Sequence, residues 1–305
     1  MTADLVQQLI DSGIHFGHKA SRWNPKMKPY ILSKHNTVHL INIRETVRGL
    51  LRAKKFIKDT VSNNKDVLFV GTKRQAKSAI LAHATRVGMP YVAERWLGGT
   101  LTNFRTIRAR LARLEELEKL EESGQLYKES KKAIARLTRE RKKILRNLSG
   151  IRNMSELPGA VVIIDAKHEH NAVLECKKLG VPSICLIDTD SDPDLVDLPI
   201  PGNDDAIRAI ELIISELADA AEAGKLGRSR DSDRKEASSR APAQKRSRRP
   251  TTSQLASEQN EQTGEPAAKA AESTEAASPG GADDPAVVAV GETASSADHA
   301  TENQT

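Results

Sequence analysis

The chain has 305 residues, of which 38% are hydrophobic and 29% charged, enough for one large domain or two small ones. Its two cysteines form no C-x-x-C motif, which fits a reducing cytosol, and no apolar run approaches the roughly 18 residues that a membrane span needs. The residues after Met1 show neither the basic nor the apolar segment of a signal peptide. We therefore expect a soluble intracellular protein.

The net charge of +6 is unevenly distributed. Residues 225–249 carry ten Lys or Arg against three acids, and residues 250–305 carry one Lys against ten acids, which leaves +8 on residues 1–224. A basic body indicates a polyanionic partner, and nucleic acid fits better than a membrane surface. The alternative is that the positive charge serves solubility alone.

Short apolar runs alternate with amphipathic runs, as in an α/β domain with a parallel sheet. A short helix over residues 3–11 is followed by a segment, 15–30, whose two prolines predict an extended arm. We predict a Pro-rich loop between residues 188 and 202. The predicted strands span residues 38–43, 67–70, 91–92, 160–164 and 183–187, and the remaining helices span 45–63, 72–87, 171–179 and 203–224.

Residues 104–148 differ in composition, with fourteen Lys or Arg against seven Glu. Leu and Ile recur every three or four residues on both sides of Ser123-Gly124, which predicts two amphipathic helices packed along one seam. An arm such as Ile107–Glu122 would be about 24 Å long. We therefore predict a coiled-coil helical hairpin that protrudes from an α/β globular body formed by residues 1–103 and 149–224.

From Lys225 onward the apolar periodicity ends, and Ala, Ser, Glu, Pro, Gly and Thr dominate. Such a composition cannot bury enough apolar surface to offset the entropy of ordering. We predict a disordered C-terminal tail over residues 225–305, basic over 225–249 and acidic over 250–305.

The predicted strand ends offer little for catalysis. Gly71-Thr72-Lys73-Arg74 places a glycine and two cations at a helix start, which suits a phosphate. The sequence nevertheless has no G-x-x-x-x-G-K-[ST], G-x-G-x-x-G, G-x-S-x-G or H-E-x-x-H motif. We therefore predict no enzyme and no catalytic residue. The alternative is an enzyme on a doubly wound α/β scaffold that acts on a phosphorylated small molecule.

Cations alternate with aromatic residues between Arg22 and Tyr30, an arrangement that suits phosphate and ribose. The alternative is that Trp23 and Tyr30 pack on the body, and both can hold at once. Together with a helix start and the hairpin base, this arm forms the predicted RNA-binding surface. Its residues are Arg22, Trp23, Lys26, Lys28, Lys73, Arg74, Arg95, Arg105, Arg108 and Arg113.

A second candidate site combines a histidine with carboxylates. Asp188 follows a predicted strand and Asp204 and Asp205 begin the last helix, and such positions share one rim of a parallel sheet. With His18 they could hold zinc, manganese or magnesium and staple the N-terminal arm to the sheet. The alternative is that Asp204 or Asp205 caps the helix, Asp188 pairs with a cation and His18 bonds to the backbone. No cofactor is otherwise required.

Five longer motifs follow one another between residues 5 and 223. They are His15-Phe16-Gly17-His18, the run from Trp23 to Ile31, the run from Phe69 to Arg74, the run from Arg95 to Asn103, and the run from Ile200 to Arg208. In this order they resemble the signatures of one family, bacterial small-subunit ribosomal protein two. One departure is Asp188-Thr189-Asp190, where the family usually has Asp-Thr-Asn.

The resemblance implies a flavodoxin-like, three-layer α/β/α body with a protruding coiled-coil hairpin. It implies a structural role on the cytoplasmic ribosome. Such a protein binds small-subunit ribosomal RNA late in assembly, lies beside other small-subunit proteins, and helps to hold ribosomal protein one, which captures messenger RNA. The resemblance ends before the C-terminal tail, so no function is transferred to those residues.

Overall fold

A computed structural model describes residues 2–124, 126 and 130–240, which belong to one compact unit, and its side chains are described between residues 4 and 228. The predicted disorder of residues 241–305 lies outside the described residues. Within the described part of the chain, no helix is both long and apolar enough to cross a lipid bilayer. The helices are α1 (Thr2–Asp11), α2 (Ile43–Ser62), α3 (Arg74–Val87), α4 (Phe104–Glu122), α5 (Lys131–Leu148), α6 (His170–Leu179) and α7 (Ile207–Arg240), with 3₁₀ helices at Pro25–Tyr30, Ser149–Ile151 and Pro193–Leu195.

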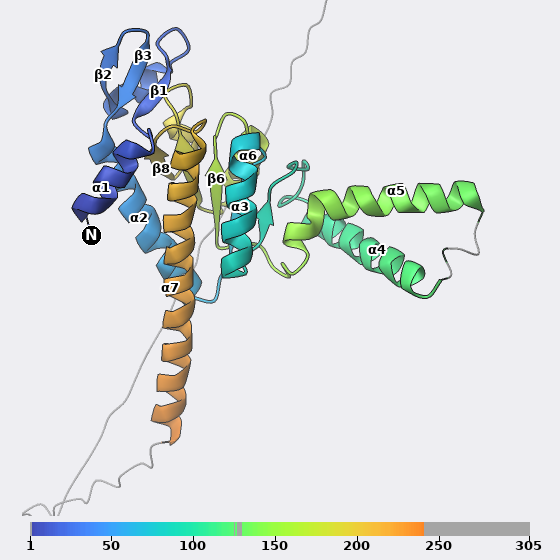
Figure 1. The fold of residues 1–305 in the computed structure, drawn as a ribbon. Coiled ribbons are helices and arrows are strands. Elements are labelled where there is room, and N and C mark those ends of the chain that lie inside the picture. Colours follow the sequence, from blue (N-terminus) through green and yellow to red (C-terminus); the bar gives the residue numbers. More distant parts are fainter. Residues whose placement is uncertain (1, 125, 127–129, 241–305) are drawn as a thin grey trace, which may run out of the picture. The chain divides into compact units, whose positions relative to one another are not determined.

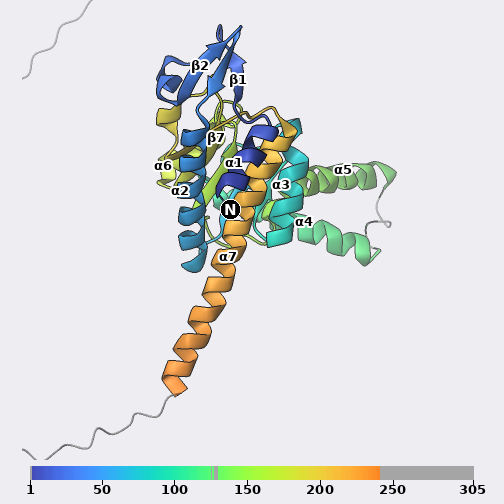
Figure 2. The ribbon, with the colours of Figure 1, turned by 60° about the vertical axis from the view of Figure 1, so that its left-hand side comes forward.

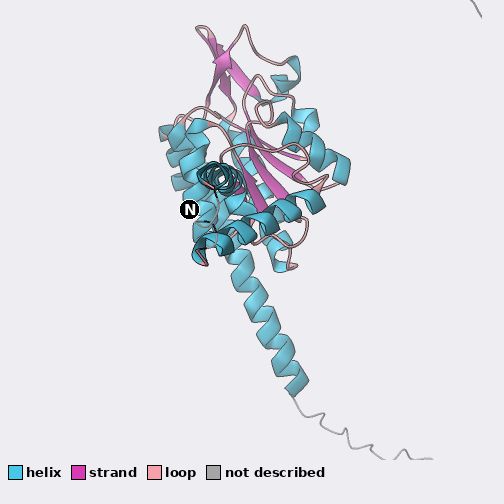
Figure 3. Ribbon diagram, turned by 90° about the vertical axis from the view of Figure 1, so that its right-hand side faces the viewer, coloured by secondary structure: helices cyan, strands magenta, loops and turns pink. Residues whose placement is uncertain are grey.

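A parallel sheet of five strands occupies the centre of the body (Figure 3). Its strands lie in the order β5-β4-β6-β7-β8, and their bounds are β4 (Val67–Val70), β5 (Tyr91–Val92), β6 (Ala160–Ile164), β7 (Ser183–Ile187) and β8 (Leu198–Pro201). The predicted Pro-rich loop is wrong for β8. Because β8 is an edge strand that pairs with β7 alone among the described residues, the missing N–H groups of Pro199 and Pro201 leave no gap in the sheet.

Helices cover both faces of this sheet (Figures 1 and 2). Successive strand residues point to opposite faces, so Phe69 and Val162 join one core with α2, α3 and α7. Leu68 and Val161 join a second core, on the face that holds α6 and the base of the inserted helices. Burial on both faces explains why these strands are continuous apolar runs, and the predicted α/β fold with a parallel sheet is confirmed.

The N-terminal segment is not a plain extended arm. It forms a second, antiparallel sheet in the order β1-β3-β2, made of β1 (Phe16–Lys19), β2 (Ile31–His35) and β3 (Val38–Ile41). The strand predicted over residues 38–43 therefore lies outside the parallel sheet and ends at Ile41. Asn36 turns the chain between β2 and β3 with a positive φ of 53°, a conformation that Asn tolerates because its side chain bonds locally.

The insertion consists of two helices, α4 and α5, that contact each other and extend away from the sheet (Figure 1). The α4 side of their seam is buried at Ile107, Leu111, Leu114 and Leu117. On α5 only Leu148 is buried among the described residues, and the predicted seam residues Ile134, Leu137 and Ile144 are half-buried. The predicted helical insertion is therefore present.

Helix α7 does not end at Gly224, as the sequence pattern predicted, but continues to Arg240 (Figures 1 and 2). Gly224 serves a different purpose: a Cβ there would lie 2.8 Å from Val61 Cβ and 2.9 Å from the Lys58 carbonyl oxygen of α2. The glycine lets two helices approach closely. Residues 225–240 therefore do not match the predicted disordered tail.

Candidate nucleic-acid interface and metal centre

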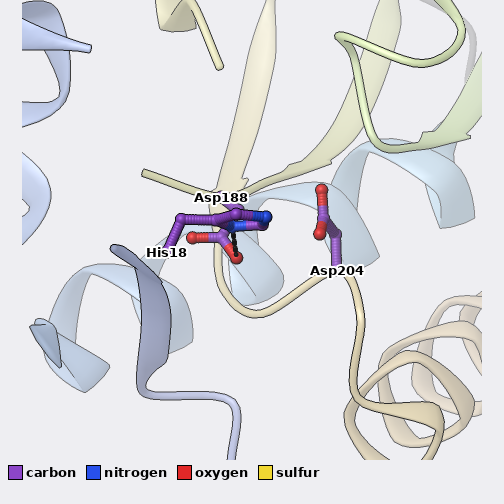
Figure 4. Close-up of side chains that lie close together, drawn as sticks. All are labelled: His18, Asp188 and Asp204. Atoms are coloured by element: carbon purple, nitrogen blue, oxygen red, sulfur yellow. Dashed lines mark ion pairs between the residues drawn. The ribbon is translucent and has the colours of Figure 1, made fainter. Parts of the chain in front are cut away.

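The predicted metal residues converge where the small sheet meets the carboxyl end of β7 (Figure 4). His18 lies on β1, and its backbone N–H donates to Thr189 Oγ1 at 2.9 Å, just after Asp188. Gly17 permits this approach, because a Cβ there would lie 2.6 Å from Thr189 Cγ2. The loop after β8 brings Asp204 to the same place. His18 thus meets two carboxylates that lie 170 and 186 positions further along the chain.

The cluster has metal-site dimensions. One ligand atom each from His18, Asp188 and Asp204 lies within 4.8 Å of the other two. His18 Nδ1 is 2.8 Å from Asp188 Oδ2, and His18 Nε2 is 3.6 Å from Asp205 Oδ2. Asp204 is buried, and its Oδ2 has no hydrogen-bond partner among the described residues. A buried carboxylate oxygen without a donor is costly, and a cation is one way to satisfy it.

Lys73 neutralises much of this charge from inside the protein. Its Nζ lies 2.9 Å from Asp204 Oδ1, 2.7 Å from Asp205 Oδ1 and 3.0 Å from Asp165 Oδ2. Burial lowers the pKa of Lys73, but these carboxylates outweigh it and hold that pKa above its usual range. Burial, with Asp165 nearby, raises the pKa of Asp204 to about 7. The hydrogen bond to Asp188 raises the pKa of His18 to about 9.

The alternative to a metal site fits only in part. Asn203, rather than Asp204 or Asp205, bonds to the backbone ahead of α7, since its Oδ1 accepts from the N–H groups of Asp205 and Ala206 at 2.8 and 3.0 Å. Asp188 pairs with His18 and not with a lysine or arginine among the described residues. His18 does bond to its neighbour, but through its backbone. The ring and the carboxylates therefore stay together.

The predicted RNA-binding residues divide between two surfaces and the interior. Lys73 belongs to the interior, because its side chain is 17% exposed and is bound by three carboxylates. Its geometry does not support a role in RNA contact. Arg74, the next residue, is exposed at the start of α3 and has no acidic partner among the described residues.

In the segment that joins β1 to β2, Arg22 and Lys28 are exposed and carry no acidic partner among the described side chains. Lys26 is exposed but lies 2.8 Å from both Asp192 and Asp194, so its charge is partly neutralised. Trp23 is half-buried, with its ring centroid 5.1 Å from that of His39. It packs on the small sheet, as one of the two interpretations of the sequence expects.

At the base of the helical insertion, Arg95 and Arg105 are exposed and have no acidic partner among the described residues. Arg108 donates to the Met154 carbonyl oxygen at 3.2 Å. Arg113 pairs with Glu116 at 2.8 Å. Two of the four arginines predicted here are therefore engaged within the protein.

A residue that the sequence analysis missed organises this base. Glu175 of α6 is buried, and both its carboxylate oxygens face the loop before α4. Oε1 accepts from Trp96 Nε1 at 3.0 Å and from the Gly99 N–H at 2.8 Å. Oε2 accepts from the Leu101 and Thr102 N–H groups at 2.9 and 3.0 Å. In the sequence, Glu175 lies three residues after Ala172, on the apolar face of its helix. A charged residue at a position expected to be buried could have indicated that Glu175 has a polar partner.

Comparison with known proteins places the chain in a family. A family model described as ribosomal protein S2 matches residues 9–224. A relative named small ribosomal subunit protein uS2 from Rhodopirellula baltica is 53% identical over 225 residues, which cover 74% of this chain and 86% of the relative. The uS2 proteins of Picosynechococcus and Mycobacterium leprae are each 51% identical, over 73% of this chain and 87% and 81% of their own lengths. The chain belongs to the ribosomal protein S2 family.

Proposed function

We propose that this chain is a structural constituent of the small ribosomal subunit and binds small-subunit ribosomal RNA through phosphate contacts. Family membership carries the proposal, since the relatives are named as small-subunit proteins. The exposed cations beside the small sheet and at the base of the insertion that have no acidic partner among the described residues supply positive charge suited to phosphate. Its place of action is the ribosome in the cytoplasm.

Two finer features of the architecture belong to the same proposal. Numbered from β4, the strand order β5-β4-β6-β7-β8 reads 2-1-3-4-5, the order of flavodoxin-like folds, which supports a flavodoxin-like body. The spacing of Ile107, Leu111 and Leu114 along α4 supports coiled-coil packing between α4 and α5. The insertion would then be a protruding hairpin that reaches RNA or a neighbouring protein.

The enzyme alternative finds no support once the family is known. Ribosomal protein S2 is a structural family, and the described strand ends hold paired carboxylates and lysine without a catalytic arrangement that we can name. A role in holding ribosomal protein one rests on the family resemblance alone, and we keep it as part of the proposal.

Salt-dependent RNA binding tests the proposal. Purified full-length chain is titrated against small-subunit ribosomal RNA by filter binding at several potassium concentrations. Each neutralised phosphate should add roughly 0.7–0.9 to the slope of log affinity against log salt. Co-sedimentation of the protein with small subunits from a gradient is the matched test in the assembly. A flat salt response, or protein that sediments only as free chain, would contradict the proposal.

We infer a second property, a divalent metal held by His18, Asp188 and Asp204, with Asp205 at the rim. The observation that favours it is the unpartnered Asp204 Oδ2 beside a histidine and a second carboxylate. Lys73 occupies Asp204 Oδ1, so the two oxygens of one carboxylate could serve different cations. Imidazole and carboxylate ligands suit zinc or manganese. The metal would tie β1 to the end of β7 and would have no part in catalysis.

Metal analysis of extensively dialysed protein decides this second proposal. The wild type should retain about one equivalent of metal, and chelator should lower its melting temperature. His18→Ala should lose the metal, whereas His35→Ala, an exposed histidine on β2, should retain it. Wild-type protein without stoichiometric metal and without a chelator effect would exclude the site.

A further inference from the structure

The two helices of the insertion carry very different charge. Helix α4 has five Lys or Arg and five Glu, whereas α5 has eight Lys or Arg and one Glu. The excess of positive charge predicted for the insertion as a whole therefore resides mainly on α5. The arginines that the sequence analysis selected, Arg105, Arg108 and Arg113, all lie on α4.

Two glutamates of α4 pair with cations on α5 and just after it. Glu121 pairs with Arg141 at 2.7 Å, and Glu118 pairs with Arg152 at 2.7 Å. The single glutamate of α5, Glu140, lies 3.9 Å from Arg113. These pairs hold the insertion together, and they leave a different group of cations without acidic neighbours.

That group lines a cleft between α5 and the loop before α4. The cleft has a volume of about 490 Å³, and its walls are Glu94, Arg95, Lys142, Lys143, Arg146 and Asn147. Arg95, Lys142 and Lys143 are exposed and have no acidic partner among the described residues. Arg146 is held in place by Glu94, whose Oε2 lies 3.1 Å from its Nη2 and 3.2 Å from its Nε.

Helical spacing brings the cations of α5 to one side of the cleft. Lys142 and Lys143 precede Arg146 by four and three residues, so the three side chains lie on adjacent positions of one helix face. The one carboxylate in the wall, Glu94, is shared between Arg146 and Lys77. The cleft thus presents a surplus of positive charge, with Arg146 paired to Glu94 and two lysines beside it that have no acidic partner among the described residues.

We propose that this cleft, and not the group Arg105, Arg108 and Arg113 on α4, is the principal phosphate-binding site of the insertion for ribosomal RNA. The proposal rests on the proposed function and adds the residues that perform it. The walls contain no aromatic side chain on which a base could stack, so contact is with the sugar–phosphate backbone. The amide of Asn147 supplies a further donor for a phosphate oxygen.

RNA fits the cleft better than an acidic protein segment. An acidic protein segment usually gains much of its affinity from apolar side chains that fit apolar pockets of its partner. The side chains that line this cleft are all polar or charged, so they offer no such pocket. A phosphate backbone needs no apolar anchor, because release of its counterions drives binding.

Two pairs of neighbouring lysines on α5 provide a matched experiment. Lys142→Ala/Lys143→Ala removes two charges from the cleft, and Lys131→Ala/Lys132→Ala removes two exposed charges from the opposite end of the same helix. Both variants of the full chain are titrated against small-subunit ribosomal RNA at 0.05–0.3 M salt, with circular dichroism melts as the control for folding. Loss of two phosphate contacts should reduce the slope of log affinity against log salt by roughly 1.4–1.8. If the variant and the wild type bind equally when extrapolated to about 1 M salt, binding at about 0.1 M salt should be roughly 25- to 60-fold weaker.

The Lys131/Lys132 variant should bind within about threefold of the wild type and keep its salt slope. Equal losses in the two variants, or an unchanged Lys142/Lys143 variant, would overturn the cleft while leaving RNA binding by the protein intact. Wild-type protein that binds no RNA would overturn the proposed function as well. A Lys142/Lys143 variant that binds RNA normally but loses a neighbouring protein from reconstituted subunits would reassign the cleft to a protein partner.

Discussion

Glu175→Gln tests how the loop at the base of the insertion is held. The carboxylate accepts hydrogen bonds from Trp96 Nε1 and from the backbone N–H groups of Gly99, Leu101 and Thr102. Glutamine replaces one oxygen with an NH₂ group, which can only donate. Whichever way the amide turns, at least two N–H groups of the loop lose their acceptor.

Each buried donor left without a partner costs about 1–3 kcal/mol. Because Gly99 and Thr102 are partly open to solvent, we expect a loss of about 2–4 kcal/mol, below the sum for two fully buried donors. Urea denaturation followed by circular dichroism measures it, with Glu211→Gln as control, since Glu211 is an exposed carboxylate of α7. Equal midpoints for the two variants would refute the claim that Glu175 organises the loop.

Two further predictions concern the same region. Burial raises the pKa of Glu175, but its backbone hydrogen bonds outweigh burial and hold that pKa below its ordinary value of 4.5. The stability that the carboxylate contributes is therefore complete above pH 4.5 and is lost as the pH falls through the folded-state pKa. The free energy of unfolding of the wild type should then fall more steeply at acid pH than that of Glu175→Gln. Excision of residues 112–143 with a short Gly-Ser closure should keep one cooperative melt. Excision of 107–147 should lower the melting temperature further, because it also removes buried Ile107 and Leu111 and half-buried Ile144 from the core of the body, and a buried aliphatic side chain contributes about 2–5 kcal/mol. Equal melting temperatures would contradict this.

The sequence predicted best those elements whose pattern is local. Buried strands such as β4 and β6 are short, wholly apolar runs, and the glycines after α3 and α6 end those helices with positive φ, 64° at Gly88 and 66° at Gly180. Both depend on neighbouring residues alone. The parallel sheet followed from their alternation.

The missed features depend on partners far away in the sequence. Strand β8 contains two prolines and reads as a loop, and only its pairing with β7 makes it a strand. Lys73 looks like a phosphate-binding cation until Asp165 and Asp204 are brought to it. The convergence of His18, Asp188 and Asp204 was predictable, because parallel strand ends share one rim of a sheet.

The glycine rule predicts that the last helix ends at Gly224, whereas close packing against α2 explains the same glycine. The contacts of Lys225 and Arg228, which follow it, test whether residues beyond Gly224 stabilise the body. Lys225 Nζ donates to the Val87 and Gly88 carbonyl oxygens at 2.6 and 3.2 Å, at the end of α3. Arg228 donates to the Val61 carbonyl oxygen, at the end of α2, from Nη2 at 2.7 Å and from Nε at 3.2 Å.

Carbonyl groups at a helix C-terminus lack partners within the helix and carry partial negative charge, so a cation there stabilises by about 0.3–1 kcal/mol, and more when partly buried. The double variant Lys225→Met/Arg228→Met keeps the apolar stems and removes both charges. We expect it to lose about 1–3 kcal/mol in urea denaturation, since the contacts lie at the protein surface. Lys131→Met/Lys132→Met, on exposed positions of α5, is the control. If the two double variants unfold at the same urea concentration, residues beyond Gly224 contribute nothing to the body, and the boundary predicted from composition would stand.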